Sequence, residues 1–142
     1  MCDLVVAADD AMFSDPVYRS LAAASVEVLV HPWVMGLRKA KEFLFTGERM
    51  PAAEAHRIGM VNRVVPRANL EAETMALAQK IAEGYPFGLK LTKKSLNRTF
   101  DMQGFSTALD AHFDTHQLAH TTSEAVSIRS GGLDKAIVHG SK

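Results

Sequence analysis

The sequence lacks cysteine pairs, since Cys2 is the only cysteine among 142 residues. A single thiol cannot form an intramolecular disulfide, which excludes the class of small secreted domains held together by disulfides. Long apolar runs are also missing, because no stretch approaches the roughly 20 apolar residues of a transmembrane helix. The first ten residues hold a short apolar run between acids and no basic leader, unlike a signal peptide. We therefore expect a cytoplasmic protein that does not contact a membrane.

A net charge is missing as well. Sixteen Lys and Arg balance sixteen Asp and Glu, so no overall field attracts the protein to nucleic acid or to anionic lipid. The composition is 47% hydrophobic and 23% charged, which is ordinary for a globular protein and far from that of disordered chains. The length suits one modest domain. These numbers predict a folded domain without a nucleic-acid partner.

Two segments have the character of β-strands. Residues 4–8 form an apolar run with two valines between acids, which is typical of a strand buried on both faces. Residues 60–65, between Gly59 and Pro66, are similar. This chain can therefore pair at most two strands by our prediction, and a two-stranded unit is marginal in water.

The remaining pattern is mostly helical, which makes this a mixed α/β chain. Segment 17–30 fits either a helix or a strand. After Thr121 the helical pattern dissolves, and we expect a loop or frayed tail at residues 130–132 (Ser-Gly-Gly). Helices are predicted at residues 33–45 with a stop at Gly47, at 52–58, at about 70–81 with Asn69 as cap and Gly84 as exit, from Pro86 to about Phe100, and at about 103–120.

The segment that follows the first strand is the most favourable location for a functional site, because many α/β folds place their catalytic and binding residues at the carboxyl ends of buried strands. Residues 15–18 follow that strand through a turn. Asp15 can act there as an acid or base, although an Asp before a Pro is more often a turn former. No nucleophile with a partnered base lies nearby.

Two groups of side chains outside that turn can either bind a ligand or simply form part of the protein surface. His112, His116 and His120 stack on one helix face, but Glu is absent from the H-E-x-x-H position, so we favour a solvated or subunit-facing surface and expect no metal. Lys93, Lys94 and Arg98 can hold a phosphate or face water, and we favour water.

Four motifs resemble the crotonase, or enoyl-CoA hydratase/isomerase, superfamily, and specifically its C-terminal half. The resemblance covers about residues 2–124, and its most distinctive block is residues 52–66. The motifs are CDLVVAA at 2–8 followed by Ala11, Phe13 and Pro16 (family pattern CDLxxAxxxAxFxxPE), AKEFLFTG at 40–47 (AxxxxLTG), AAEAHRIGMVNRVVP at 52–66 (AxEAxxxGLVxxVxP), and KKSLN at 93–97 in the lysine-containing helix that follows.

The resemblance implies an α/β fold, the C-terminal part of the crotonase/ClpP-like spiral fold. Residues 1–66 would belong to the spiral core, residues 67–124 would form a helical region used for oligomerisation, and residues 125–142 would be a tail. Family members act on acyl-CoA thioesters in fatty acid metabolism, with coenzyme A as part of the substrate and no tightly bound cofactor. They assemble as trimers or hexamers, so we expect a homo-oligomer.

The resemblance also implies a chemistry. Crotonases stabilise an enolate with two backbone N–H groups, and preorganised donors of this kind give large catalytic terms. Hydratases add two glutamates for acid–base work. The oxyanion-hole segments and the first glutamate lie upstream of the CDL motif in the family and have no counterpart here. The second glutamate would follow Pro16, and this chain has Val17 there.

The departures define the site that we expect. Pro16, Val17 and Trp33 would border the acyl pocket, Lys93 would approach a CoA phosphate, and no residue of the chain would be catalytic. Loss of a general acid–base residue lowers the reaction rate about 100- to 10,000-fold. We therefore expect a poor hydratase, unless Glu27 or another carboxyl takes the place of the missing glutamate.

Three interpretations of this truncated pattern stay open. The chain is the C-terminal part of a longer enzyme, which we favour, or a naturally short non-catalytic subunit that assembles or binds acyl-CoA, or a decayed product that barely folds.

Overall fold

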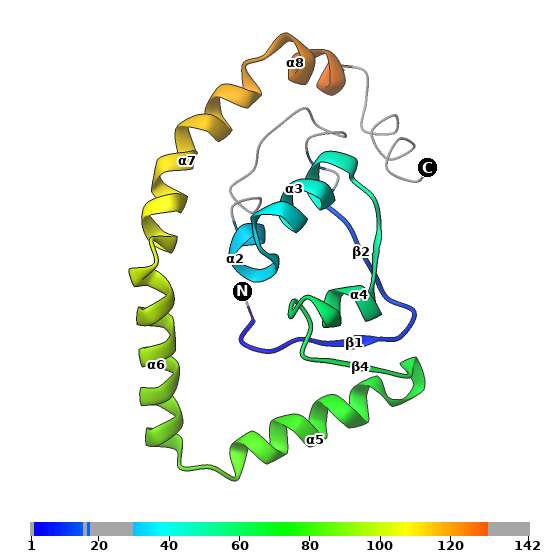
Figure 1. The fold of residues 1–142 in the computed structure, drawn as a ribbon, viewed down its shortest axis with the longest axis vertical. Helices are drawn as coiled ribbons and strands as arrows, with labels where there is room; N and C mark the ends of the chain where they lie inside the picture. The colour runs from blue at the N-terminus through cyan, green and yellow to red at the C-terminus, as the bar shows by residue number, and fades with distance from the viewer. Residues whose placement is uncertain (1, 16, 18–29, 131–142) are drawn as a thin grey trace.

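The computed structural model describes residues 2–15, 17 and 30–130. A small α/β body contains the strands and the first helices, and the later helices run around it as an arc (Figure 1). In chain order the elements are β1 (Val6–Ala8), β2 (Met12–Phe13), α2 (His31–Met35), α3 (Leu37–Thr46), β3 (Met50–Pro51), α4 (Ala52–Arg57), β4 (Arg63–Val65), the 3-10 helix η2 (Arg67–Asn69), α5 (Leu70–Ala82), α6 (Pro86–Met102), α7 (Phe105–His120) and α8 (Ser123–Ser130).

The two segments with strand character do pair. β1 and β4 are parallel, with Ala7 opposite Val64. Asn62 extends the ladder, because its backbone N–H donates to the Val5 carbonyl at 2.9 Å and its side-chain Oδ1 accepts the Val5 N–H at 2.8 Å. Both strands are shorter than the apolar runs that predicted them.

A second, smaller pair was not predicted. β2 and β3 are antiparallel, with Met12 opposite Pro51 and Phe13 opposite Met50. Two-residue strands leave no periodicity to read in a sequence, so the expectation of only two strand segments was wrong.

The core lies between these strands and the helices α3 and α4. Ala52 and Ala55 of α4 are completely buried, and their small side chains let this helix approach the strands closely. The Ala52 N–H donates to the Ala11 carbonyl at 2.9 Å, which fixes the start of α4 against the residue that precedes β2. The buried cluster consists of Ala7, Met35, Ala40, Phe43, Met50, Ala52, Ala55 and Val61.

The predicted helix at residues 33–45 is in fact two helices. Gly36 separates α2 from α3 with a φ of 76° and a ψ of 151°, a conformation that residues with a Cβ rarely adopt. The predicted stop is confirmed, because Gly47 is left-handed and its N–H donates to the Phe43 carbonyl at 3.1 Å.

The helices of the arc correct two further expectations. Asn69 is the N-cap residue of α5, as predicted, but its side chain makes no capping hydrogen bond; its N–H donates to the Pro66 carbonyl at 2.8 Å in the tight turn η2. Regular structure also continues beyond Thr121 as α8. Thr122 begins this helix, since its Oγ1 accepts the Ala125 N–H at 3.2 Å and its carbonyl accepts the Val126 N–H at 3.0 Å.

An ion pair and an aromatic cluster connect the arc to the body. Lys93 of α6 pairs with Asp3. Trp33 of α2 lies 5.5 Å from the ring of Phe100 and 6.1 Å from that of Phe105, and those two rings are 5.0 Å apart (centroid distances). The cluster therefore joins α2 to the junction of α6 and α7.

The arc leaves much apolar surface uncovered in the described part of the chain. None of the residues of α5, α6 and α7 is fully buried. None of the described helices is both long and apolar enough to cross a membrane. Large exposed apolar side chains of α6 and the turn before it are Tyr85, Phe87, Leu89, Leu91, Leu96 and Met102.

Replacing Trp33 by Ala tests the connection between arc and body. We expect Trp33→Ala to lower the free energy of unfolding by about 2–3 kcal/mol, because it removes three-ring packing between α2 and the α6–α7 junction. Urea titration followed by circular dichroism measures this. The control is Met102→Ala on α6, where the side chain is 87% exposed and the expected change is within about 0.5 kcal/mol. Equal effects of the two substitutions would contradict the assignment.

Candidate functional site

Asp15 organises the turn that follows β2. Its Oδ1 accepts the backbone N–H of Val17 at 3.2 Å, so it does act as a turn former. Its other oxygen, Oδ2, lies 3.6 Å from Nε2 of His31, and both side chains are about 15% exposed. One carboxylate thus fixes the backbone at Val17 and faces an imidazole at the start of α2.

His31 is the site residue that the sequence analysis missed. His31-Pro32 has the pattern of a chain break, and the structure places Pro32 in the first turn of α2 with His31 as its first residue. The His31 ring also lies 5.6 Å from the Phe43 ring of the core. No spacing in the sequence links His31 to Asp15, since the contact depends on how the intervening chain folds.

Val17, whose backbone N–H donates to Asp15, is half-buried. Its side chain is an alkyl group that neither accepts nor donates a proton. By contrast, a carboxylate beside an imidazole can hold or pass a proton and orient the ring. Pro16 and Glu27 lie outside the described residues.

The other predicted site residues, Trp33 and Lys93, both take part in contacts between the arc and the body. Trp33 comes two residues after His31 and turns its ring to Phe100 and Phe105. Lys93 lies on α6, paired with Asp3. Their roles at an acyl pocket and at a CoA phosphate stay predictions.

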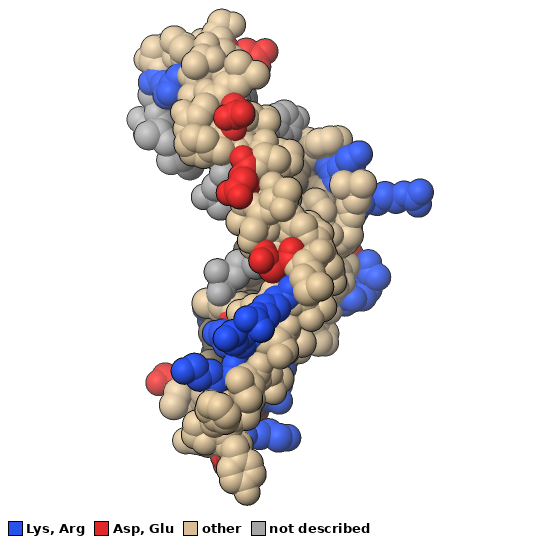
Figure 2. All heavy atoms as spheres, turned by 90° about the vertical axis from the view of Figure 1, so that its left-hand side faces the viewer, with Lys and Arg blue, Asp and Glu red and all other residues tan. Residues whose placement is uncertain are grey.

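The face of the arc has an uneven charge distribution. Figure 2 shows Lys and Arg gathered over its lower part and acidic side chains along its upper part. The basic residues of α6 are Lys90, Lys93, Lys94 and Arg98, and the acids that follow along the arc are Asp101, Asp110, Asp114 and Glu124.

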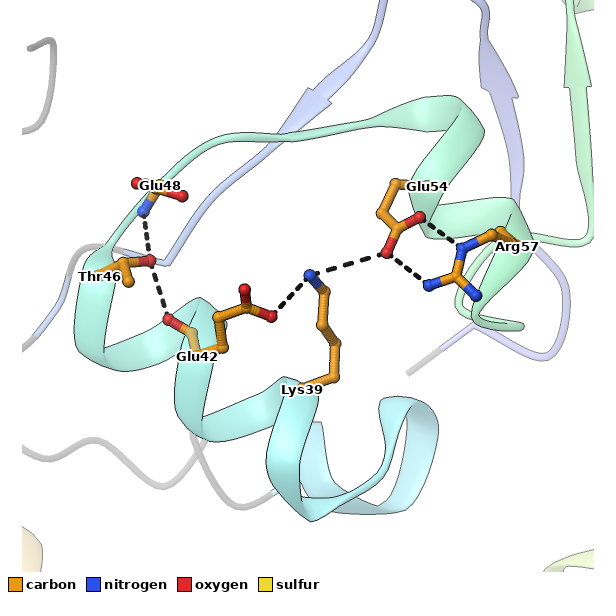
Figure 3. Close-up of polar contacts among 6 residues, drawn as sticks. All are labelled: Lys39, Glu42, Thr46, Glu48, Glu54 and Arg57. Atoms are coloured by element: carbon orange, nitrogen blue, oxygen red, sulfur yellow. Dashed lines mark hydrogen bonds and ion pairs between the residues drawn. The ribbon is translucent and has the colours of Figure 1, made fainter.

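A surface network ties α3 to α4 (Figure 3). Nζ of Lys39 lies 2.8 Å from Oε2 of Glu42 and 3.6 Å from Oε1 of Glu54. Arg57 donates two hydrogen bonds to Glu54, from Nε at 2.7 Å and from Nη2 at 2.8 Å. These bonds, with a smaller contribution from Lys39, lower the pKa of the Glu54 carboxyl, and Glu42 raises the pKa of Lys39.

The histidine stripe lies on α7. His116 and His120 are in contact through their Nε2 atoms, 3.2 Å apart, and His112 is exposed one turn earlier. Within residues 2–15, 17 and 30–130, no three or more His, Cys, Asp or Glu side chains gather as a metal site.

Comparison with known proteins defines the class. The family model for enoyl-CoA hydratase/isomerase matches residues 1–133, and the chain belongs to this family. It is 45% identical over 119 residues to the putative enoyl-CoA hydratase EchA13 of Mycobacterium tuberculosis, covering 84% of this chain and 37% of that protein. It is 28% identical over 142 residues to the short-chain-enoyl-CoA hydratase of Clostridium acetobutylicum, covering 99% of this chain and 54% of that one.

Solved structures agree with this assignment. A probable enoyl-CoA hydratase from Mycobacterium thermoresistibile has a TM-score of 0.80 at 51% identity, over 89% of this chain and 52% of that chain. An enoyl-CoA hydratase/isomerase from Xanthobacter autotrophicus has a TM-score of 0.85 at 35% identity, over 98% of this chain and 54% of that chain. The predicted crotonase fold is confirmed, and the chain spans about half the length of these solved structures.

The Glu54 network gives a prediction for acid pH. Because the folded state lowers the pKa of Glu54, its stabilising contribution is present above the ordinary carboxyl pKa and is lost as the pH falls through the folded value. We expect Arg57→Gln to raise this pKa towards its usual range, and Lys39→Gln to raise it less. Carboxyl carbon NMR titration measures both. Arg49→Gln removes an exposed arginine outside the network and should leave the Glu54 titration unchanged; a shift equal to that of Arg57→Gln would argue for a general charge effect.

Proposed function

We propose that this chain forms part of an acyl-CoA-binding protein of fatty acid metabolism, and that the segment after β2 lines the acyl side of the thioester site. The supporting observation is the arrangement around Asp15, whose carboxylate accepts the N–H of the half-buried Val17 and also contacts His31. Family membership makes an acyl-CoA thioester the substrate class to test. Coenzyme A enters as part of the substrate, and no tightly bound cofactor belongs to the proposal.

Val17 limits the chemistry of this site. An alkyl side chain in this position offers apolar contact to an acyl chain and no acid–base group. We therefore assign this segment a binding role, with Pro16 and Trp33 as further pocket residues. Hydration would be slow unless another group supplies the proton transfer.

Lys93 is the proposed contact for a CoA phosphate. Lys93 and Asp3 are both more than half exposed, and ion pairs of this kind contribute little to stability. The ammonium can therefore exchange Asp3 for a phosphate at low cost. Lys90, Lys94 and Arg98 on the same helix add positive charge around it (Figure 2).

Assembly is the second candidate role, favoured by the uncovered apolar side chains of α6. Leu96 is 65% exposed and Phe87 is 71% exposed. Apolar surface of this extent commonly marks contact with another protein surface. The proposed assembly is a homo-oligomer, either a trimer or a hexamer, and the proposed location is the cytoplasm. Size-exclusion chromatography with light scattering measures the oligomeric state.

Calorimetric titration with acetyl-CoA and with a longer acyl-CoA tests the binding proposal. We expect saturable binding that weakens about 3- to 10-fold in Lys93→Gln, because one charge-assisted phosphate contact is lost. Lys94→Gln is the matched control, as the neighbouring lysine on the same helix, and should weaken binding less than twofold, because Lys94 adds only to the general positive charge. Equal weakening in both variants would reduce Lys93 to one member of a general basic surface, and no binding would contradict the proposed function.

Val17→Glu tests the consequence of the missing carboxylate. In the protein as the cell makes it, we expect this variant to hydrate a short enoyl-CoA about 100-fold or more faster than wild type, because general acid–base catalysis is worth about 100- to 10,000-fold. The control is Val17→Gln. Its side chain is nearly the same size as that of Glu but has no carboxylate, so it should not raise the hydration rate. An ordinary hydratase rate in the wild type would show that another residue already performs this step.

A further inference from the structure

The last turn of α7 contains a histidine pair that the proposed function does not use. His116 and His120 are four residues apart on this sixteen-residue helix, and both are half-buried. Their ring centroids are 4.6 Å apart and the ring planes are nearly perpendicular, at 88°. The atoms that face each other are the two Nε2 nitrogens, separated by 3.2 Å.

That separation matches the distance between two nitrogen ligands of one metal ion. Zinc–nitrogen bonds of about 2.0–2.1 Å place two ligands about 3.3–3.4 Å apart at a tetrahedral angle, and about 2.9 Å apart at a right angle. The observed 3.2 Å lies between these values. An ion held by both nitrogens would take the place of the hydrogen bond that now joins the two rings.

Two charges beside the histidine pair act on a bound cation in opposite directions. The carbonyl groups at the end of an α-helix carry partial negative charge, and His120 is the last residue of α7. Arg129 of α8 already donates hydrogen bonds to the carbonyls of His120 and Ala125, the latter at 3.3 Å. This places a guanidinium at the backbone of His120, where it opposes a second cation. The site therefore has one favourable and one unfavourable charge beside it.

We propose that His116 and His120 form a two-histidine chelate for a divalent transition-metal ion of the zinc or nickel type. Imidazole is a preferred ligand of these ions, whereas Mg²⁺ and Ca²⁺ prefer oxygen. The missing Glu of the H-E-x-x-H motif argues against a metalloprotease site, but a chelate of two imidazoles does not need it. With two protein ligands, water or another donor completes the coordination, so binding is reversible.

Titration with Zn²⁺ tests this proposal independently of acyl-CoA binding. The protein carries no affinity tag and has Cys2 replaced by Ser, because the exposed Cys2 thiol is a competing ligand. Calorimetry should show one Zn²⁺ per chain with a micromolar dissociation constant and no comparable binding of Mg²⁺. We expect His116→Gln and His120→Gln each to weaken binding at least tenfold.

His112→Gln is the matched control, since His112 is exposed on the same helix one turn earlier; it should change the affinity less than twofold. Ring-nitrogen NMR of the protein with all histidines present avoids any folding defect of the variants, and Zn²⁺ should shift the resonances of His116 and His120 first. Equal weakening by His112→Gln, unchanged binding in the pair variants, or NMR shifts at other histidines would overturn the proposal.

Discussion

The parallel pairing of β1 with β4 is the constraint on which the rest of the structure depends. It joins Val5 to Asn62 and Asp9 to the Val65 carbonyl, and so closes a loop of more than fifty residues. Arg67 strengthens the far end of this pair, since its Nε donates to Asp10 at 2.6 Å. The described elements between the two strands, including α3, α4 and the turn at Asp15, are positioned by this closure.

The body built on this pairing is small, and its helices contribute unequally. Two paired strands are marginal in water, and half of the buried cluster consists of alanines, which bury little apolar surface each. The aromatic contact of Trp33 with Phe100 and Phe105 packs the arc against the body. The large apolar side chains of α6 nevertheless stay exposed. This imbalance is the physical basis for proposing an assembly, because covering those side chains would add the hydrophobic burial that the body lacks.

The sequence predicted the paired strands and most helices, because apolar runs and helical spacing are local signals. It missed the division at Gly36, since a glycine inside an amphipathic pattern does not reveal its φ, and it missed α8, whose cap at Thr122 is followed by no long apolar stripe. At the site, Asp15 and Val17 are only two positions apart in the sequence and were predicted together. His31 was not, because a contact between residues sixteen positions apart, across a segment of ambiguous pattern, depends on tertiary folding. The pairing of His116 and His120 follows from their spacing, whereas the 3.2 Å approach of their nitrogens does not.

The proposed function has acyl binding beside the Asp15–His31 pair and the phosphate contact on α6. Photo-crosslinking tests this placement most directly, using an acyl-CoA with a diazirine at the end of a short acyl chain and the protein as the cell makes it. After irradiation and digestion, mass spectrometry locates the label. If the acyl chain binds as proposed, the label will lie within residues 12–17 and 30–35, and an excess of unlabelled acyl-CoA will suppress the labelling. Labelling that concentrates on α5 or α8, or that unlabelled acyl-CoA does not suppress, would contradict it.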